Sequence, residues 1–330
     1  MKVLFISNSL NIHQAIFWDC FVANSDVSLV FLETDPTDNG IKEKCQRGYT
    51  MLSSKINNCD VNLFMNSFDV IIVGHCSDKR FFNFPKDKII IHCSEHFWKK
   101  INTPISLCKR ILKMIILKKR YKKVKNLFVF ATSSRLFNEL SAIKLNFKAC
   151  YKFGYFPPVN EELDLSCKND KSIIYAGRLI KCKRPQRSLF LLKKLQENDA
   201  SYSLSYIGKG ELENRLKKKA KKINNVSFGP YISHEELLLK FKQSSIFCFS
   251  SNREEGWGAV LNETLSSGCI VFADEAAGST KYLIKNVFPV PANPDNVKTI
   301  PCKSSTVAVV VVFSQILEYQ SFISFLADSC

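Results

Sequence analysis

The chain has 330 residues, of which 46% are hydrophobic and 23% are charged. These values are typical of folded globular proteins and exclude a disordered or fibrous chain, and the length predicts two domains of about 150 residues each. Lys and Arg total 47 against 30 Asp and Glu, a formal net charge of +17. Such an excess predicts an anionic partner, which can be nucleic acid, an acidic membrane surface or a phosphate-bearing substrate.

Cysteine usage and apolar runs bear on where the protein works. The 13 cysteines are scattered and form no CxxC pair of the kind that zinc or redox sites use, so we expect reduced thiols in a cytoplasmic protein. The apolar run within residues 1–7 is too short for a secretory signal. The longest run, residues 307–313, is far shorter than the roughly 20 residues that a membrane-spanning helix needs. We therefore expect any membrane contact to be peripheral.

Short apolar runs rich in Val, Ile and Phe alternate with helical patterns along the chain, which is typical of parallel sheets built from βαβ units. In the first half we expect strands at residues 2–7, 27–33, 70–73, 88–92, 127–131 and 149–153. Two prolines and an acidic stretch after Tyr155 predict a domain boundary. The predicted organisation is an N-terminal domain at 1–157, a second domain at 158–290 and an atypical tail at 291–330.

The alternation restarts beyond the boundary. We expect strands at residues 172–176, 203–207, 226–228, 246–250 and 269–273, and helices at 185–196, 211–222, 234–243 and 259–267. The predicted fold class is α/β, with two Rossmann-like doubly wound domains that face each other across a cleft. Because ligands bind beyond the carboxyl ends of the strands in such sheets, polar residues just after strands are the candidates for a site.

The segment from Glu255 to Glu263 runs from the end of one expected strand into the next helix. Gly256 and Gly258 lack a Cβ atom, so a ligand can approach the backbone closely, and the helix start offers unpaired N–H groups to an anion. This pattern predicts a phosphate site with a carboxylate on either side. Glu263, about two turns into the helix, can accept hydrogen bonds from vicinal hydroxyls such as those of ribose.

A second candidate segment, also at a strand end, contains Gly177, Arg178 and Lys183. Arg178 can hold phosphate oxygens bidentately and Lys183 adds a point charge. Taken alone, Glu263 could be a solvated helix residue, Glu255 could complement a helix dipole, and the two cations could be surface ion-pair partners. Their joint occurrence at strand ends favours a site.

Both segments resemble the family 4 glycosyltransferases, in the pattern Gly-Arg-Leu-x-x-x-Lys at 177–183 and Glu-Gly-aromatic-Gly-x-x-x-x-Glu at 255–263. Supporting segments at 206–210, 225–229 and 266–271 follow in the family's order, so the resemblance covers roughly residues 170 to 285. It implies a GT-B fold and a retaining transfer from a nucleotide-sugar donor to a saccharide or lipid-linked acceptor, with no cofactor and no metal ion.

The resemblance also implies residue roles. Arg178 and Lys183 would bind the diphosphate and stabilise the charge on the departing nucleotide, while Glu255 would contact the donor sugar and Glu263 the ribose. The family holds the base near residues 229–231. The nucleotide-contacting set that follows is Gly177, Arg178, Lys183, Gly229, Tyr231, Gly256, Trp257, Gly258, Ala259, Val260 and Glu263.

The sequence of the first domain identifies functional residues less clearly. Residues 8–14, 94–100 and 152–157 resemble bacterial surface-polysaccharide glycosyltransferases, which implies a role in making capsule or lipopolysaccharide, although His96 stands where that group has arginine. His75 and His92 follow expected strands, where an acceptor hydroxyl would arrive. Each can be a catalytic residue that accepts or relays a proton, or a hydrogen-bonded structural histidine, and Glu95 ranks with them.

A basic amphipathic helix is expected from Thr103, an N-cap before Pro104, to about Lys125. Its apolar stripe comprises Ile105, Cys108, Ile111, Leu112, Ile115 and Ile116. Its remaining faces carry Lys109, Arg110, Lys113, Lys118, Lys119, Arg120, Lys122, Lys123 and Lys125. Two interpretations stay open: residues 104–125 bind an anionic membrane surface, where lipid-linked acceptors would reside, or the stripe packs on the sheet and the lysines are solvated.

Two alternatives to an active transferase remain. A basic nucleic-acid-binding protein is the first, but the basic run has no interleaved aromatic residues, so we expect no nucleic-acid partner. The second is a catalytically disabled relative, because the region after Ser279 departs from the family pattern. For the tail we expect a helix between about 304 and 326 that packs back on the protein, and deletion after Pro301 to lower the melting temperature or solubility.

Overall fold

The structure is a computed structural model that describes residues 1–10, 12–35, 48–53, 61–99, 104–156 and 163–284. The chain divides into two compact units, Met1–Pro158 and Val159–Cys330. The predicted boundary after residue 157 is adjacent to this division. The tail at 291–330, including its expected helix, lies outside the described residues.

The first unit is built on a parallel sheet of seven strands in the order β3-β2-β1-β4-β5-β6-β7. All six strands expected in this half are confirmed, with bounds that differ by at most two residues. The additional strand, β3, is an edge strand of four residues that begins with Thr and ends with Ser, too short for a periodic signal. The bounds are β1 (Lys2–Ser7), β2 (Ser28–Glu33), β3 (Thr50–Ser53), β4 (Val70–Val73), β5 (Ile89–Ser94), β6 (Asn126–Ala131) and β7 (Ala149–Lys152).

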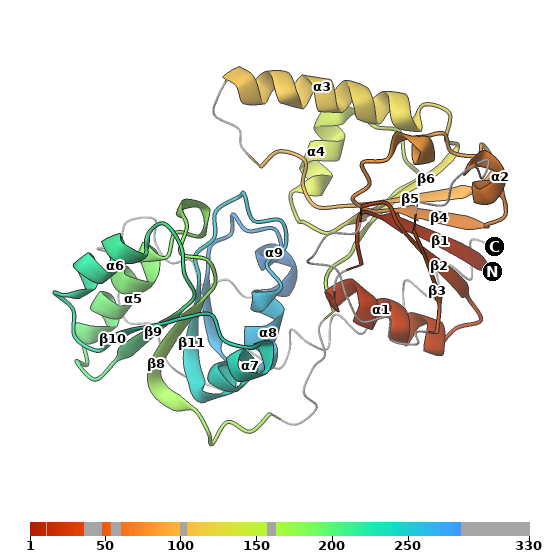
Figure 1. Cartoon of the computed structure of the whole chain (residues 1–330). Helices are drawn as coiled ribbons and strands as arrows, with labels where there is room; N and C mark the ends of the chain where they lie inside the picture. Colours follow the sequence, from red (N-terminus) through yellow and green to blue (C-terminus); the bar gives the residue numbers. More distant parts are fainter. Residues whose placement is uncertain (11, 36–47, 54–60, 100–103, 157–162, 285–330) are drawn as a thin grey trace. The chain divides into compact units, whose positions relative to one another are not determined.

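Helices cover both faces of this sheet (Figure 1). Alternate side chains of a strand point to opposite faces, so Leu4 and Ile6 of β1 pack into one core with α2, α3 and α4, whereas Phe5 faces α1. On the α1 face, the rings of Phe5 and Trp18 lie 5.2 Å apart between centroids. The helix bounds are α1 (Ile12–Ala23), α2 (Val61–Asn66), the short 3-10 helix η1 (Lys79–Phe82), α3 (Pro104–Tyr121) and α4 (Leu136–Ile143).

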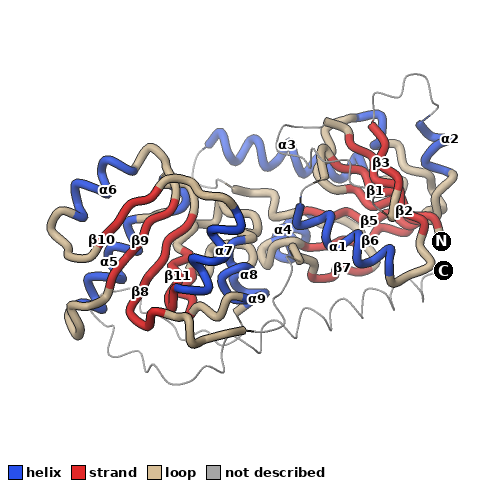
Figure 2. Tube along the Cα trace, turned by 60° about the horizontal axis from the view of Figure 1, so that its bottom comes forward, coloured by secondary structure: helices blue, strands red, loops and turns tan. Residues whose placement is uncertain are grey.

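The second unit repeats the plan with five parallel strands in the order β10-β9-β8-β11-β12. Helices α5 and α6 cover one face and α7 and α8 the other (Figure 2). The strand bounds are β8 (Asn169–Ala176), β9 (Ser203–Ile207), β10 (Val226–Gly229), β11 (Ser244–Phe249) and β12 (Ile270–Ala273). The helix bounds are the 3-10 helix η2 (Lys181–Lys183), α5 (Gln186–Gln196), α6 (Glu213–Ala220), α7 (His234–Gln243), α8 (Val260–Ser266) and α9 (Thr280–Leu283).

Strand β8 has a special position in this unit because it pairs with β9 on one side and with β11 on the other. The winding of the chain reverses between β8 and β11, which is the point of a doubly wound sheet where ligands bind. Both candidate segments lie beyond this point, since residues 177–183 directly follow β8 and residues 255–263 run from the loop after β11 into α8. The predicted α/β class with two Rossmann-like domains is confirmed.

Candidate functional site

Glycine backbone forms the end of β8, β9 and β10. The Gly177 N–H donates to the carbonyl of Ile207 at 3.0 Å, and the Gly208 N–H donates to Gly229 at 3.2 Å. A Cβ atom on Gly208 would lie 2.2 Å from the carbonyl oxygen of Gly177. A side chain is therefore excluded at Gly208, and the three glycines leave bare peptide groups at the carboxyl edge of the sheet.

Lys183 and Glu255 meet at this edge, although they are far apart in the sequence. The Lys183 ammonium forms an ion pair with Oε2 of Glu255, and the side chains are 20% and 15% exposed. The Ser251 hydroxyl donates to the same carboxylate oxygen at 2.9 Å. The loops after β8 and β11 thus bring together a cation suited to phosphate and a carboxylate suited to sugar hydroxyls.

Arg178 lies in the same loop as Lys183 and differs from it in its surroundings. Its side chain is exposed and forms no hydrogen bond or ion pair with any of the described residues. Its carbonyl oxygen is held by the hydroxyl of Tyr175 at 3.1 Å, and burial raises the pKa of that tyrosine. The loop is anchored through its backbone, and the guanidinium remains available to an anion.

The glycines around Trp257 shape the loop before α8. Gly258 has a φ of 85°, and a Cβ atom there would lie 2.3 Å from Cζ of Phe249, so only glycine fits. Trp257 is buried, and its indole N–H donates to Oδ1 of Asn262 at 2.8 Å. Trp257 was expected to contact the nucleotide, but its ring is buried and anchors the loop. Gly256 is buried beside it, while Ala259 and Val260, at the start of α8, are partly exposed.

Glu263 is only 6% exposed, so the interpretation as a solvated helix residue is wrong. Its Oε1 lies 3.1 Å from Nε2 of His234, the first residue of α7. His234 was missed from the sequence. A usable signal was the capping box of Ser233 and Glu236, which predicts that His234 begins a helix right after β10. At the same end of the sheet, Tyr231 is 56% exposed and its hydroxyl donates to the Lys209 carbonyl at 3.3 Å.

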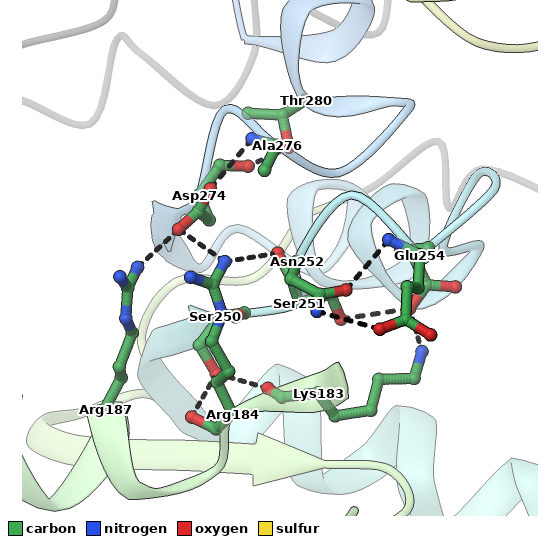
Figure 3. A network of polar contacts seen from close by, with 11 residues as sticks. Lys183, Arg184, Arg187, Ser250, Ser251, Asn252, Glu254, Asp274, Ala276 and Thr280 are labelled. Atoms are coloured by element: carbon green, nitrogen blue, oxygen red, sulfur yellow. Dashed lines mark hydrogen bonds and ion pairs between the residues drawn. The ribbon is translucent and has the colours of Figure 1, made fainter. Parts of the chain in front are cut away.

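A further charged residue missed from the sequence, Arg184, connects the loops of this site (Figure 3). Its guanidinium donates to the carbonyls of Ser250 at 3.0 Å and Ser251 at 3.1 Å, and to Oδ2 of Asp274 at 2.7 Å. Asp274, which follows β12, also forms an ion pair with Arg187. The ends of β11 and β12 are therefore tied to the segment between β8 and α5.

The two candidate histidines of the first unit have different surroundings. His75 is exposed, whereas His92 is buried, with Nδ1 2.8 Å from the Tyr121 hydroxyl. Burial lowers the pKa of His92 to about 3, and the nearby charges of Arg120 and Lys113 act in the same direction. This placement favours the structural interpretation of His92.

Carboxylates of the first unit are held by internal partners. Glu95 forms an ion pair with Lys99 at 3.5 Å. Glu139 is buried, and it accepts hydrogen bonds from the backbone N–H groups of Phe97 and, at 3.3 Å, Trp98. Glu139 was missed from the sequence because only tertiary folding brings α4 to the loop after β5.

Helix α3 presents its apolar stripe outward, so the interpretation in which this stripe packs on the sheet is wrong. The outward side chains are 48% to 68% exposed, and they are Ile105, Leu107, Ile111, Leu112, Ile115 and Ile116. The inner face instead buries Leu117 and Tyr121 and stacks cations on rings, with Arg120 3.6 Å from the centroid of Phe82. The lysines at 118, 119, 122 and 123 are exposed beside the apolar residues.

Within the described ranges, no group of three or more His, Cys, Asp or Glu side chains is placed to hold a metal ion. Among the helices described there, none is both long enough and apolar enough to cross a membrane.

Residues 164–299 match the family model described as glycosyl transferases group 1. The second unit carries the sequence pattern of that family. The matched region contains both segments of the site, from Arg178 through Glu263. No curated protein sequence matches the chain.

Solved structures with the same fold are GT-B glycosyltransferases at low sequence identity. HepE from Anabaena in complex with UDP has a TM-score of 0.62 at 13% identity, over 99% of this chain and 100% of that one. A mutant of S. aureus TarM in complex with fondaparinux, alpha-GlcNAc-glycerol and UDP has a TM-score of 0.61 at 10% identity, over 96% and 94%. An alpha-glucosyltransferase in complex with UDP-glucose and DNA has a TM-score of 0.51 at 13% identity, over 82% and 78%. These similarities establish the GT-B fold.

Proposed function

We propose that the protein is a retaining glycosyltransferase that moves a sugar from a nucleotide-sugar donor to a saccharide or lipid-linked acceptor. The observation that carries the proposal is the meeting of Lys183 and Glu255 at the switch point of the second sheet, with the exposed Arg178 in the same loop. This arrangement lies inside the region that matches the group 1 family. The resemblance of residues 8–14, 94–100 and 152–157 to bacterial surface-polysaccharide glycosyltransferases supports cell-surface polysaccharide as the product.

The two cations supply the chemistry at the leaving group. When the bond to the donor sugar breaks, negative charge develops on the departing diphosphate, and Arg178 and Lys183 neutralise it. Two cations at the leaving group serve the purpose for which other transferases use a metal ion, so we propose that transfer is independent of metal. Glu255 holds the donor sugar and Glu263, oriented by His234, holds the ribose. The base lies near Gly229 and Tyr231.

A thermal-shift series with UDP, GDP, ADP and dTDP tests the donor site. Binding raises apparent stability by mass action, about 2.7 kcal/mol at a ligand concentration of 100 times the Kd. We expect one of the four diphosphates to raise the melting temperature and inorganic phosphate to have no comparable effect. UDP is the first probe, because HepE and TarM have been solved with it. If none of the four stabilises the protein, the donor assignment is wrong.

We propose that the acceptor is linked to a membrane lipid and that α3 docks on that anionic surface from the cytoplasmic side. The observation that favours this is the outward apolar face of α3, from Ile105 to Ile116, next to exposed lysines at 118, 119, 122 and 123. Apolar side chains enter the acyl boundary while lysines pair with lipid phosphates, and each lysine contributes about 1 kcal/mol near such a surface.

Co-sedimentation with vesicles of phosphatidylglycerol and phosphatidylcholine tests the docking surface. Replacement of Lys118, Lys119, Lys122 and Lys123 by Gln should weaken binding at least 10-fold at low salt. The matched control changes four exposed lysines in the second unit, with the same loss of charge but no apolar face beside them. These control positions are Lys218, Lys219, Lys221 and Lys222. Equal binding by both variants would refute the docking surface.

A second pair of measurements separates a membrane from nucleic acid. Ile111→Ser with Ile115→Ser removes apolar surface and leaves the charge unchanged, so it should weaken vesicle binding and leave binding to a DNA duplex unchanged. Tight DNA binding by the wild-type chain, reduced by the lysine variant and untouched by the isoleucine variant, would instead assign α3 to a nucleic-acid acceptor.

A further inference from the structure

Arg184 has a backbone conformation that side-chain-bearing residues rarely adopt. It ends the 3-10 helix η2 with φ 47° and ψ 50°, the left-handed region that favours glycine. It directly follows Lys183, which carries the ammonium group of the site. An arginine at such a position indicates that its side chain contributes something that glycine cannot.

The guanidinium of Arg184 binds three acceptors on two strand ends (Figure 3). These acceptors are the carbonyls of Ser250 and Ser251 after β11 and the carboxylate of Asp274 after β12. The planar fork of arginine can reach acceptors in several directions at once, whereas the lysine ammonium is a point charge on a flexible stem. Its side chain is 24% exposed, so solvent screens these contacts only in part.

These contacts close a ring around the candidate catalytic pair. The Ser251 hydroxyl donates to the Glu255 carboxylate, Glu255 pairs with Lys183, and the Lys183 carbonyl accepts from the Ser250 hydroxyl at 2.8 Å. Arg184 clamps the Ser250–Ser251 backbone from the other side. Arg187 also binds Asp274 but is 51% exposed.

We propose that Arg184 is a positioning residue that fixes Lys183 and Glu255 relative to each other before the donor arrives. Its effect on turnover rests on the proposed glycosyl transfer; its effect on the placement of Lys183 does not. Charges held in place before reaction need no reorganisation when the leaving group departs, which is where electrostatic catalysis gains its advantage. Glycine would suit the backbone conformation but would remove the side-chain link from this position to Ser250, Ser251 and Asp274.

Lysine reactivity tests the placement without any need for turnover. In Arg184→Gly, acylation of Lys183 by an N-hydroxysuccinimide acetate ester, followed by mass spectrometry, should be at least 3-fold faster than in the wild type. Other lysines should react at their wild-type rates, and Arg187→Gln, the matched control, should leave Lys183 unchanged. An unchanged rate at Lys183 would overturn the proposal. So would a general increase over all lysines, because Arg184 would then only support the fold.

Steady-state kinetics test the consequence for transfer. We expect Arg184→Gly to lower kcat at least 10-fold with a KM within 3-fold of the wild type, and Arg187→Gln to keep both values. Arg184→Lys keeps the charge without the fork, so it should also lower kcat, and it serves as the second variant if Arg184→Gly does not fold. Equal kcat in all three variants would overturn the proposal. If the wild type turns over no donor, the proposed function fails, and the acylation rates still decide the role of Arg184.

Discussion

The two units place their candidate titratable residues in different surroundings. In the second unit, Lys183 and Glu255 remain partly exposed and Arg178 is exposed at the switch point. In the first unit, His92 in β5 and Glu139 in α4 are buried and bound to internal partners, whereas His75, after β4, is exposed. The candidate groups of the second unit can therefore reach a ligand, while His92 and Glu139 hold the fold of the first unit together.

The difference explains why functional residues could be predicted from the sequence in the second unit but not in the first. A diphosphate requires cations and unobstructed peptide N–H groups, and both are supplied by short consecutive segments at strand ends. In the first unit, no comparable pair of consecutive segments was recognised in the sequence. Its polar residues are brought together by loops and by α4, so proximity to a strand end does not by itself mark a functional residue.

The largest effect is expected from removal of the two cations of the second unit. Arg178→Ala and Lys183→Ala should each weaken nucleoside-diphosphate binding about 10- to 100-fold, because a charge-assisted contact is worth roughly 1.5–3 kcal/mol. Titration calorimetry with the stabilising diphosphate measures the change. Lys194→Ala is the control, since Lys194 forms its ion pair with Glu197, just beyond the end of α5. Wild-type affinity in both site variants would contradict the assignment.

The two glutamates should separate binding from turnover. Glu263→Gln is expected to weaken nucleotide binding, whereas Glu255→Gln should lower kcat by roughly 10-fold or more with a smaller effect on diphosphate affinity, since it contacts the sugar. Glu254→Gln, in the same loop as Glu255, controls for a general loss of charge. Identical kinetic behaviour of all three variants and the wild type would show that the paired glutamates have no role.

Gly258 tests whether the shape of the loop depends on glycine. Gly258→Ala has to accommodate a φ of 85° and a clash with the Phe249 ring, so it should lower the free energy of unfolding by about 1–3 kcal/mol. Urea denaturation measures the change. Gly229→Ala is the control, because its Cβ would meet only the Tyr206 carbonyl at an ordinary 3.6 Å. Equal destabilisation of both variants would refute the argument.

The smallest expected effect is on the pH dependence of stability, and it comes from the buried His92 of the first unit. Its pKa of about 3 lies below the ordinary value near 6.5. Below pH 6.5 the unfolded chain binds a proton at this histidine, whereas the native state binds one only near pH 3. The contribution of His92 to the free energy of unfolding is therefore present above pH 6.5 and is lost as the pH falls from there towards 3. The loss should reach about 1 kcal/mol at pH 5.5. His92→Gln should remove this part of the pH dependence in urea melts, and His75→Gln, at an exposed site, should not.

The positions of the strands and of both site segments followed from the sequence with little error. Runs rich in Val, Ile, Leu and Phe predicted β1 and β4 with the observed bounds, because central parallel strands are buried on both faces. The Gly-Arg and Glu-Gly patterns predicted that loops after two strands form one site. Arg184 and His234 were missed because their partners are distant in sequence: Ser250, Ser251 and Asp274 for the arginine, and Glu263 for the histidine.

By itself, the sequence determined the alternation of elements, the excess of positive charge and the residue types available at each strand end, since these depend on local composition and spacing. Only the tertiary structure decided which charges meet and which faces stay open. The apolar stripe of α3 has a helical period whether it faces inward or outward. Because Leu117 and Tyr121 pack into the core, the stripe faces outward. Likewise, Lys183 pairs with Glu255 because the adjacent parallel strands β8 and β11 bring their carboxyl ends to one edge of the sheet. The sequence patterns predicted a shared site there, but the ion pair itself appears only in the tertiary structure.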